Sequence, residues 1–200
     1  MTVILDPAPI RAENPHRTPI LLLGGWAALA VLASASGVFD RMAPEAFALV
    51  VVALTVALTT AYFTVPAVRR YAERLGPYGL AYFHVWRIAA ALVFFAYGAQ
   101  ALLPPLFIAL AGWGDLVAGL FAAVLVMLAR RRRTILTFHL VGMADFILAV
   151  GTGLTLTMLA TPGMETISTL PVALIPLIGV PISAATHIAA LHMIAKGRVV

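Results

Sequence analysis

Apolar residues fill six long stretches of the chain, and few charged side chains interrupt them. These stretches cover about residues 18–38, 44–67, 79–103, 105–129, 134–160 and 170–195. Each is close to the roughly 20 residues that an α-helix needs to cross the hydrocarbon core of a bilayer. Charged or turn-forming residues mark the breaks, as at Asp40-Arg41, Pro104-Pro105 and Thr161-Pro162-Gly163. The pattern predicts an all-α fold, a polytopic bundle of six transmembrane helices over residues 18–195, with the third and fourth spans forming a tight antiparallel hairpin.

The composition supports a membrane domain with short polar tails. The chain is 62% hydrophobic and 10% charged, with a mean hydropathy of +1.03, whereas a soluble domain carries roughly 25% charged residues. Residues 1–17 contain no apolar run long enough for a signal peptide. We expect them to form a cytoplasmic tail, with residues 196–200 as a second one. Cysteine is absent, which excludes disulfides, thiolate metal sites and iron–sulfur clusters.

The distribution of Lys and Arg predicts the orientation of the bundle. If the N-terminus is inside, eleven basic residues outside the spans lie on the cytoplasmic side and only Arg41 lies on the outer side. Because cytoplasmic loops carry the excess of basic residues, both termini are predicted to be cytoplasmic, in a bacterial inner membrane. The net charge of +5 is then explained by contact with anionic lipid headgroups, and nucleic-acid binding is not expected. The cytoplasmic set is Arg11, Arg17, Arg69, Arg70, Arg74, Arg130, Arg131, Arg132, Arg133, Lys196 and Arg198.

Three charged side chains lie well inside predicted spans: Arg87, Asp115 and Asp145. A charge at the middle of the membrane costs about 2.5–3.5 kcal/mol on insertion scales. Each of these side chains should therefore face the interior of the bundle and be paired, neutralised or hydrated. Arg87 against two aspartates leaves one negative charge over, so either one aspartate is protonated or a histidine is protonated as its partner. Both outcomes predict a proton-labile site.

Histidines extend this polar set. At 1.5 Å per residue, His84 and His139 lie roughly 8 Å from the cytoplasmic ends of their helices, and His187 about 12 Å. The polar groups should therefore converge on the cytoplasmic half of the bundle, as a cup that opens inward. His84 and Arg87 are three residues apart and share a helix face. His139 and Asp145 lie roughly 120° apart around their helix. This phase argues against a tight metal site, and none is predicted.

Prolines at five-residue spacing distort the sixth predicted span. Pro176 and Pro181 lack the amide that would bond four residues back, which frees the carbonyls of Val172 and Leu177. Inside a membrane such breaks survive where they are buried in protein or line a cavity. A distorted helix followed by His187 suits a binding or permeation site, although a packing kink would look the same in sequence.

The second half of the chain, over residues 80–195, resembles an uncharacterised family of small six-helix bacterial inner-membrane proteins. The resemblance is carried by His84 to Arg87, by GWGDLVAGL at 112–120, by GMAD at 142–145 and by LPVALIPLIGVPISAATHIAAL at 170–191. The fifth helix of that family usually has Trp-Asn where this chain has Phe138-His139. The site residues that the resemblance implies are Arg87, Asp115, Asp145 and His187. It implies a fold and a location but no activity.

The sequence leaves several functions open. The first is binding or transport of a small solute, ion or proton at Arg87, Asp115, Asp145 and His187. A second is an accessory subunit without chemistry, in which the buried charges orient helices or meet a membrane partner or another copy of the chain. A third is a membrane b-type haem protein, with two of His84, His139 and His187 as axial ligands. The fourth is an intramembrane enzyme that uses a metal or acid–base chemistry. No cofactor is firmly predicted, and catalysis is not the favoured reading.

Overall fold

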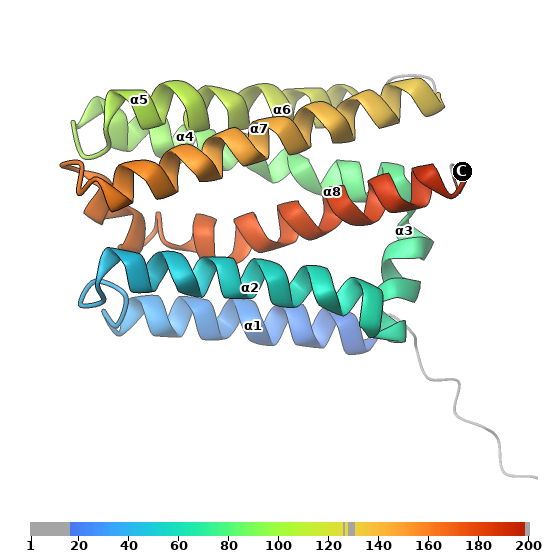
Figure 1. Cartoon of the computed structure of the whole chain (residues 1–200), viewed down its shortest axis with the longest axis horizontal. Helices are drawn as coiled ribbons and strands as arrows, with labels where there is room; N and C mark the ends of the chain where they lie inside the picture. Colours follow the sequence, from blue (N-terminus) through green and yellow to red (C-terminus); the bar gives the residue numbers. More distant parts are fainter. Residues whose placement is uncertain (1–16, 126, 128–130, 199–200) are drawn as a thin grey trace, which may run out of the picture.

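The computed structural model describes residues 17–125, 127 and 131–198, and within them the chain is a bundle of α-helices (Figure 1). The all-α prediction is confirmed. Almost all of the expected N-terminal tail, residues 1–16, lies outside the described residues, as do Arg130 and the last two residues. The elements in order are α1 (Arg17–Ala35), α2 (Pro44–Thr64), α3 (Pro66–Phe83), the 3₁₀ turn η1 (His84–Trp86), α4 (Arg87–Ala99), α5 (Pro105–Phe107), the π-helical η2 (Ile108–Gly112), α6 (Trp113–Leu125), α7 (Arg132–Met158), the 3₁₀ turn η3 (Met164–Ser168), the π-helical η4 (Ile175–Gly179) and α8 (Val180–Ala195).

Five continuous helical segments are long and apolar enough to cross a membrane. They are Pro44–Thr64, Pro66–Ala99, Pro105–Leu125, Arg132–Met158 and Ile175–Ala195. The described apolar part of the first helix, Pro19–Ala35, is shorter. The positions of the expected spans agree with these segments to within a few residues, apart from the third and the sixth.

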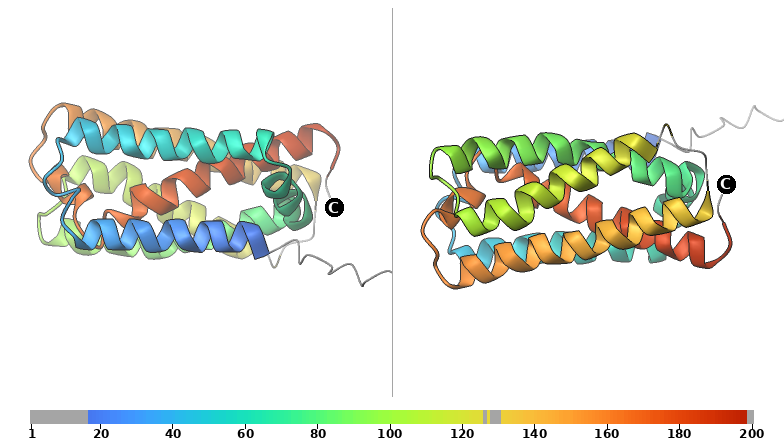
Figure 2. Two further views of the ribbon diagram at one scale, coloured as in Figure 1. Left: turned by 90° about the horizontal axis from the view of Figure 1, so that it is seen from below. Right: turned by 90° about the horizontal axis from the view of Figure 1, so that it is seen from above.

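Helix α8 is the central helix of the bundle. It packs against α2, α3 and α7. In the apolar segment Ile175–Ala195, which contains α8, 61% of the 18-residue apolar stretch is buried, whereas the value for α2 is 17%. In Figure 1 it runs between α7 and α2, and Figure 2 shows that it crosses the bundle obliquely. Helices α4 and α6 pack together as the predicted hairpin, and α1 lies at the outer edge. Side chains on α8 therefore reach the middle of the molecule.

The third predicted span begins earlier than expected. Residues 68–78, which separate the second and third predicted spans, are mostly helical, because α3 starts at Pro66. The helix breaks at Gly76, which has a φ of +65°. Pro77 restarts the helix after the break because its fixed φ suits a first turn. The part before Gly76 carries charged residues on an amphipathic stretch, so hydropathy alone did not reveal it. It crosses one end of the bundle (Figure 1).

The sixth predicted span is not one continuous helix. Residues 164–168 form η3, turns follow, and a π-helical segment holds Pro176 before α8 starts at Val180. The carbonyl of Val172 was expected to be free. It instead accepts a hydrogen bond from the amide of Ile175 at 2.9 Å. A π-helical turn absorbs a proline without leaving the backbone unpaired. The expected distortion exists, and it lies at residues 175–179.

Small residues allow the close approach of helices around Arg87. A Cβ added at Gly119 would lie 2.8 Å from the backbone nitrogen of Ile88 and 3.3 Å from the carbonyl carbon of Arg87. The backbone at the start of α4 therefore rests directly on α6. In lipid, helices associate mainly by this kind of packing, since no hydrophobic force draws them together. Gly119 thus fixes where the Arg87 side chain begins.

Replacing Gly119 with alanine should destabilise the bundle by about 1–3 kcal/mol, because the added methyl group meets backbone that cannot move aside. The matched control is Gly151→Ala on α7, where a Cβ would have no atom within 4 Å. That change should be neutral or raise stability by up to about 1 kcal/mol, through helix propensity. Thermal unfolding in detergent measures both. Equal midpoints for the two variants would contradict the proposed close contact.

Candidate functional site

A buried arginine binds two aspartates at the centre of the bundle. Arg87 is 2% exposed, and its Nε donates a hydrogen bond to Oδ1 of Asp115 at 2.6 Å. Its Nη2 donates to Oδ2 of Asp145. The three residues come from α4, α6 and α7. The structure therefore brings together the three intramembrane charges that the sequence singled out, and one guanidinium ties three helices. We call this set, Arg87, Asp115 and Asp145, the charged triad.

Glycines place the two carboxylates. Asp115 lies four residues before Gly119 on α6, so it shares the face that rests on Arg87. At Gly114 a Cβ would collide with the carboxylate of Asp145. Only a residue without a side chain leaves room for Asp145 to reach the guanidinium past α6. Gly114 thus lets α6 approach closely, and the group that uses the space is the carboxylate of Asp145.

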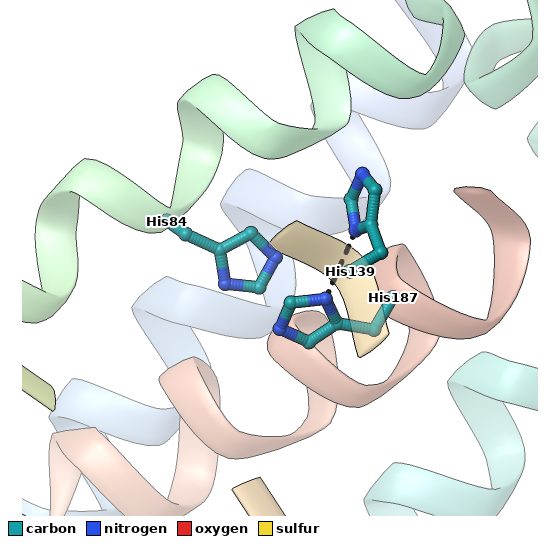
Figure 3. A group of neighbouring side chains, drawn as sticks. All are labelled: His84, His139 and His187. Atoms are coloured by element: carbon teal, nitrogen blue, oxygen red, sulfur yellow. Dashed lines mark hydrogen bonds between the residues drawn. The ribbon is translucent and has the colours of Figure 1, made fainter. Parts of the chain in front are cut away.

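Three histidines meet inside the bundle (Figure 3). His84, His139 and His187 are each 0% exposed, and one ring nitrogen from each lies within 4.8 Å of those of the other two. The 3₁₀ turn η1 places His84 and Arg87 on one face, because residues three apart eclipse each other there. Each histidine comes from a different helical segment. The predicted site residue His187 thus belongs to this histidine cluster, together with His84 and His139.

Hydrogen bonds and ring contacts define the histidine cluster. Nδ1 of His139 lies 3.0 Å from Nδ1 of His187, and Nε2 of His139 lies 3.0 Å from the carbonyl oxygen of Pro77. The rings of His84 and His187 are stacked, with centroids 4.0 Å apart and planes inclined by 26°. Nε2 of His84 is 3.1 Å from the hydroxyl oxygen of Thr186. Phe138 contacts all three rings, so the cluster is closed to solvent.

A cavity of about 130 Å³ reaches the charged triad. Arg87, Asp115 and Ser183 lie at its inner end, and aromatic and aliphatic side chains such as Phe47, Phe94 and Phe107 form its walls. Two further lining residues, Val52 and Leu154, are 45% and 42% exposed. The cavity therefore also reaches the outer surface of the helix bundle.

Three buried polar atoms around this cavity have no hydrogen-bond partner among the described residues. They are Nη1 of Arg87, Nε1 of Trp86 and Oγ of Ser183, and all three residues line the cavity. Unpaired buried polar atoms are rare in folded proteins and need an explanation such as an ion, a water molecule or a ligand.

A second cavity, of about 340 Å³, lies between α6 and α7. Asp145 and Gly114 line it, together with Trp113 and Phe138. The charged triad therefore separates two cavities, one reached from Asp115 and the other from Asp145.

The direction in which the first cavity extends differs from the expected cup. It reaches Pro44 at the start of α2, Thr157 near the end of α7 and Ile167 in η3. These residues lie at the end of the bundle opposite the basic residues of α3 and α7. The basic end is filled by buried side chains, among them Ile135 and Ile194. The kink at Gly76 folds α3 across that end, and this closure could not be read from helix depth alone.

The haem alternative would require the histidine rings to move apart. A porphyrin held by two axial histidines must lie between them. The faces of His84 and His187 are in contact, and His139 shares a short hydrogen-bond distance with His187. The rings would have to separate widely to admit a haem. A single small ion needs no such separation.

Several residues of the site escaped sequence reasoning. Trp86 packs against Gly179, where a Cβ would overlap its ring, and Gly142 makes similar room for His187. Thr186 bonds the carbonyl of Ile182 at 2.7 Å and also contacts His84. Oγ of Ser183 is buried and has no hydrogen-bond partner within the described part of the chain. The signal available in sequence was the four-residue spacing of Ser183 and His187, which places them on one face of α8.

One protein family matches most of the chain. The family described as "Domain of unknown function (DUF8737)" matches residues 44–195. The chain belongs to this family. The match contains the charged triad and the histidine cluster and leaves out α1. No curated protein and no solved structure matches the chain. The expected membership of a family without an assigned activity is thus supported, while bacterial origin and the inner membrane stay predictions.

Replacing Arg87 with methionine should cost about 3–5 kcal/mol of stability, since it leaves two carboxylates buried without their cation. Arg69→Met is the control. Arg69 pairs with Glu73 at 3.0 Å but its side chain is 38% exposed, so its loss should cost no more than about 1 kcal/mol. Adding Asp115→Asn to Arg87→Met should recover part of the loss. Unfolding midpoints in detergent measure all three, and similar small effects at both arginines would contradict the buried network.

Proposed function

We propose that the protein is a six-span integral membrane protein that binds and moves a small solute, an ion or a proton at the charged triad, with His187 beside it. Five helical segments of sufficient length and apolar character support a membrane location. The first helix would supply the sixth span. The supporting observation is the buried Arg87, bonded to two carboxylates and placed between two cavities.

The proposed orientation places both termini in the cytoplasm. It is supported by the basic residues gathered at one end of the bundle. There Arg198 bonds Glu73 of α3 at 2.6 Å, and the hydroxyl of Tyr78 bonds the carbonyl of Arg131 at 3.0 Å. The loop between α1 and α2, with Arg41, lies at the other end. This asymmetry follows the positive-inside rule. The polar end of the first cavity would then be reached from the outer half of the membrane.

The charge of the triad favours proton exchange. One guanidinium and two carboxylates sum to a net negative charge when all three are ionised. A net charge in an apolar interior is costly, so the triad gains by binding a proton or another cation. Since Asp115 lines one cavity and Asp145 the other, a proton taken up from one cavity can be released to the other. The same geometry would couple proton movement to a solute that contacts Arg87.

The first cavity suits a neutral solute with a hydrogen-bond acceptor. The unpaired Nη1 of Arg87 and Nε1 of Trp86 are both donors, and the hydroxyl of Ser183 can also donate. The surplus negative charge disfavours a carboxylate or phosphate at this point. A compact apolar molecule with a carbonyl group fits this chemistry, and it could enter from lipid past Val52 and Leu154.

The accessory reading is less well supported. Helices that are merely tied together need a sealed interior with each charge satisfied. Here Arg87 binds two aspartates instead of one, a donor of its guanidinium is unpaired, and cavities adjoin it. The unpaired donor and the cavities cost stability without improving helix packing.

Asp115→Asn and Asp145→Asn should each abolish proton flux, because an amide can neither accept nor deliver the proton. Flux is measured in proteoliposomes with an enclosed pH-sensitive dye under an imposed potassium potential. The control is Asp40→Asn, in an exposed turn, which should conduct like the wild type. Thermal unfolding must show that both triad variants are folded. A wild type no faster than protein-free vesicles, or undiminished flux in both variants, would refute the proposal.

Acetophenone should raise the unfolding midpoint of the protein more than ethylbenzene does, since the two differ in the carbonyl that the unpaired donors can bind. Ala149 lines the cavity, so Ala149→Phe should fill it and remove the difference. Ala144 lies on the exposed face of the same helix, and Ala144→Phe should preserve it. Equal shifts from both compounds in the wild type would argue against a carbonyl ligand.

A further inference from the structure

Two ring nitrogens of the buried histidine cluster are not used in hydrogen bonds. Nδ1 of His84 and Nε2 of His187 are buried and have no hydrogen-bond partner among the described residues. A histidine that serves only to pack the core normally has its polar atoms satisfied. Two unpaired nitrogens on stacked rings, beside a third imidazole, therefore need a different explanation.

The protonation pattern of His139 and His187 follows from their neighbours. The carbonyl oxygen of Pro77 can only accept, so Nε2 of His139 carries the hydrogen between them. In a neutral ring, Nδ1 of His139 is then a bare acceptor. Since it lies 3.0 Å from Nδ1 of His187, the latter must carry the shared hydrogen. Two nitrogens from two helices thus point at each other across a single proton, as the dashed line in Figure 3 shows.

The proton position on His84 follows in the same way. The hydroxyl of Thr186 lies 2.7 Å from the carbonyl oxygen of Ile182 and 3.0 Å from that of Ser183, so its hydrogen is directed to the backbone. Its oxygen is left to accept from Nε2 of His84. Neutral His84 therefore has its lone pair on Nδ1, the atom without a partner.

We propose that His84, His139 and His187 bind a divalent transition-metal ion, with Zn²⁺ as the reference ion. The ion takes the position of the proton between the two Nδ1 atoms. That proton moves to the unpartnered Nε2 of His187, so both rings stay neutral and each presents a lone pair. Zinc–nitrogen bonds are about 2.0–2.1 Å long, and ligand nitrogens around tetrahedral zinc are about 3.3 Å apart. The pair at 3.0 Å has to open only slightly.

The third ligand requires one ring movement. His84 is stacked on His187 with the planes inclined by 26°, and parallel rings cannot aim lone pairs at one point. Rotation of the His84 ring about its side-chain bonds brings a nitrogen to the ion, because the donor atoms already lie within 4.8 Å. Three histidines leave the fourth position of zinc open.

The surroundings match those of metal-binding histidines. Such residues usually donate their other N–H to a carbonyl or another acceptor, which fixes the tautomer and the ring orientation. The Pro77 carbonyl does this for His139, and Thr186 does it for His84. The charged triad, whose Arg87 follows His84 by three residues, carries the surplus negative charge that a buried cation needs. Soft thiolates are absent from the whole sequence, and imidazole ligands suit Zn²⁺, Cu²⁺ and Ni²⁺.

A metal ion at the histidine cluster would differ from the expectation of no metal site. That expectation rested on the angle between residues of one helix, such as His139 and Asp145. The cluster instead takes one histidine from each of three helical segments, so the phase within a helix does not limit it. Gly142 on α7 leaves room for the ring of His187 from α8, since a Cβ at Gly142 would lie 2.5 Å from Cε1 of His187.

The test is direct binding of Zn²⁺ and Co²⁺ to the purified protein. After treatment with a chelator, the wild type should bind one equivalent of Zn²⁺ in equilibrium dialysis. With Co²⁺ it should show the visible absorption of a low-coordinate site. His139→Gln and His187→Gln should each weaken binding by at least about 100-fold, and Thr186→Val, which removes an outer partner, by about 10–100-fold.

A matched control is His192→Gln. His192 lies on α8 as His187 does, but it bonds the Tyr62 hydroxyl at 2.9 Å, away from the cluster, so its loss should leave Zn²⁺ affinity unchanged. Where a cluster variant fails to fold, the wild type decides alone. Added Zn²⁺ should raise its unfolding midpoint, with saturation at one equivalent. Absence of stoichiometric binding by folded wild type, or binding equally strong in His139→Gln, would overturn the proposal.

This site is separable from the proposed function. Asp145→Asn, which should abolish proton flux, leaves the three imidazoles in place and should still bind one equivalent of Zn²⁺. His139→Gln removes the metal ligand and keeps the charged triad. Loss of flux with retained metal binding, or the reverse, therefore tells which of the two assignments fails.

Discussion

The pairing of one guanidinium with two carboxylates in an apolar bundle determines much of this structure. Arg87 cannot lie in lipid unpaired, so α6 and α7 must both deliver an acidic side chain to it. This delivery requires helices that nearly touch, and Gly119 and Gly114 supply the contact. The 3₁₀ turn before α4 then sets His84 on the same face as Arg87. Burial of the charge and position of the histidine cluster thus have one cause.

The central helix shows the opposite tendency, because it leaves polar atoms unsatisfied. The π-helical η4 and Gly179 let the ring of Trp86 lie against the backbone, and Ser183 and His187 follow one turn apart on α8. Three of these residues, Trp86, Ser183 and His187, hold buried atoms without a hydrogen-bond partner among residues 17–125, 127 and 131–198. A bundle selected for stability alone would replace them with apolar side chains at a gain. Their concentration around one segment indicates that binding, rather than packing, accounts for them.

Much of the fold could be predicted from the sequence, because a bilayer imposes a length and an apolar composition on each helix. The contact of Arg87 with Asp115 and Asp145 could also be predicted, since charged side chains within membrane spans must face the bundle interior. Other features depend on how helices rotate about their axes. Whether His84, His139 and His187 face one another is set by contacts such as Gly142 with His187, which no single helix encodes. The amphipathic start of α3 was hidden because its charges mimic a loop.

Helix α7 links the two sites. It carries His139, then Gly142 against the ring of His187, then Asp145 on the guanidinium of Arg87, at intervals of three residues. His84 at the start of η1 and Arg87 at the start of α4 are also three residues apart. A metal ion that separated the rings of His139 and His187 would have to move α7 or α8, because packed interiors yield in discrete steps. Any coupling between a metal ion and the charged triad would therefore pass through the position of α7, and it must act equally in both directions.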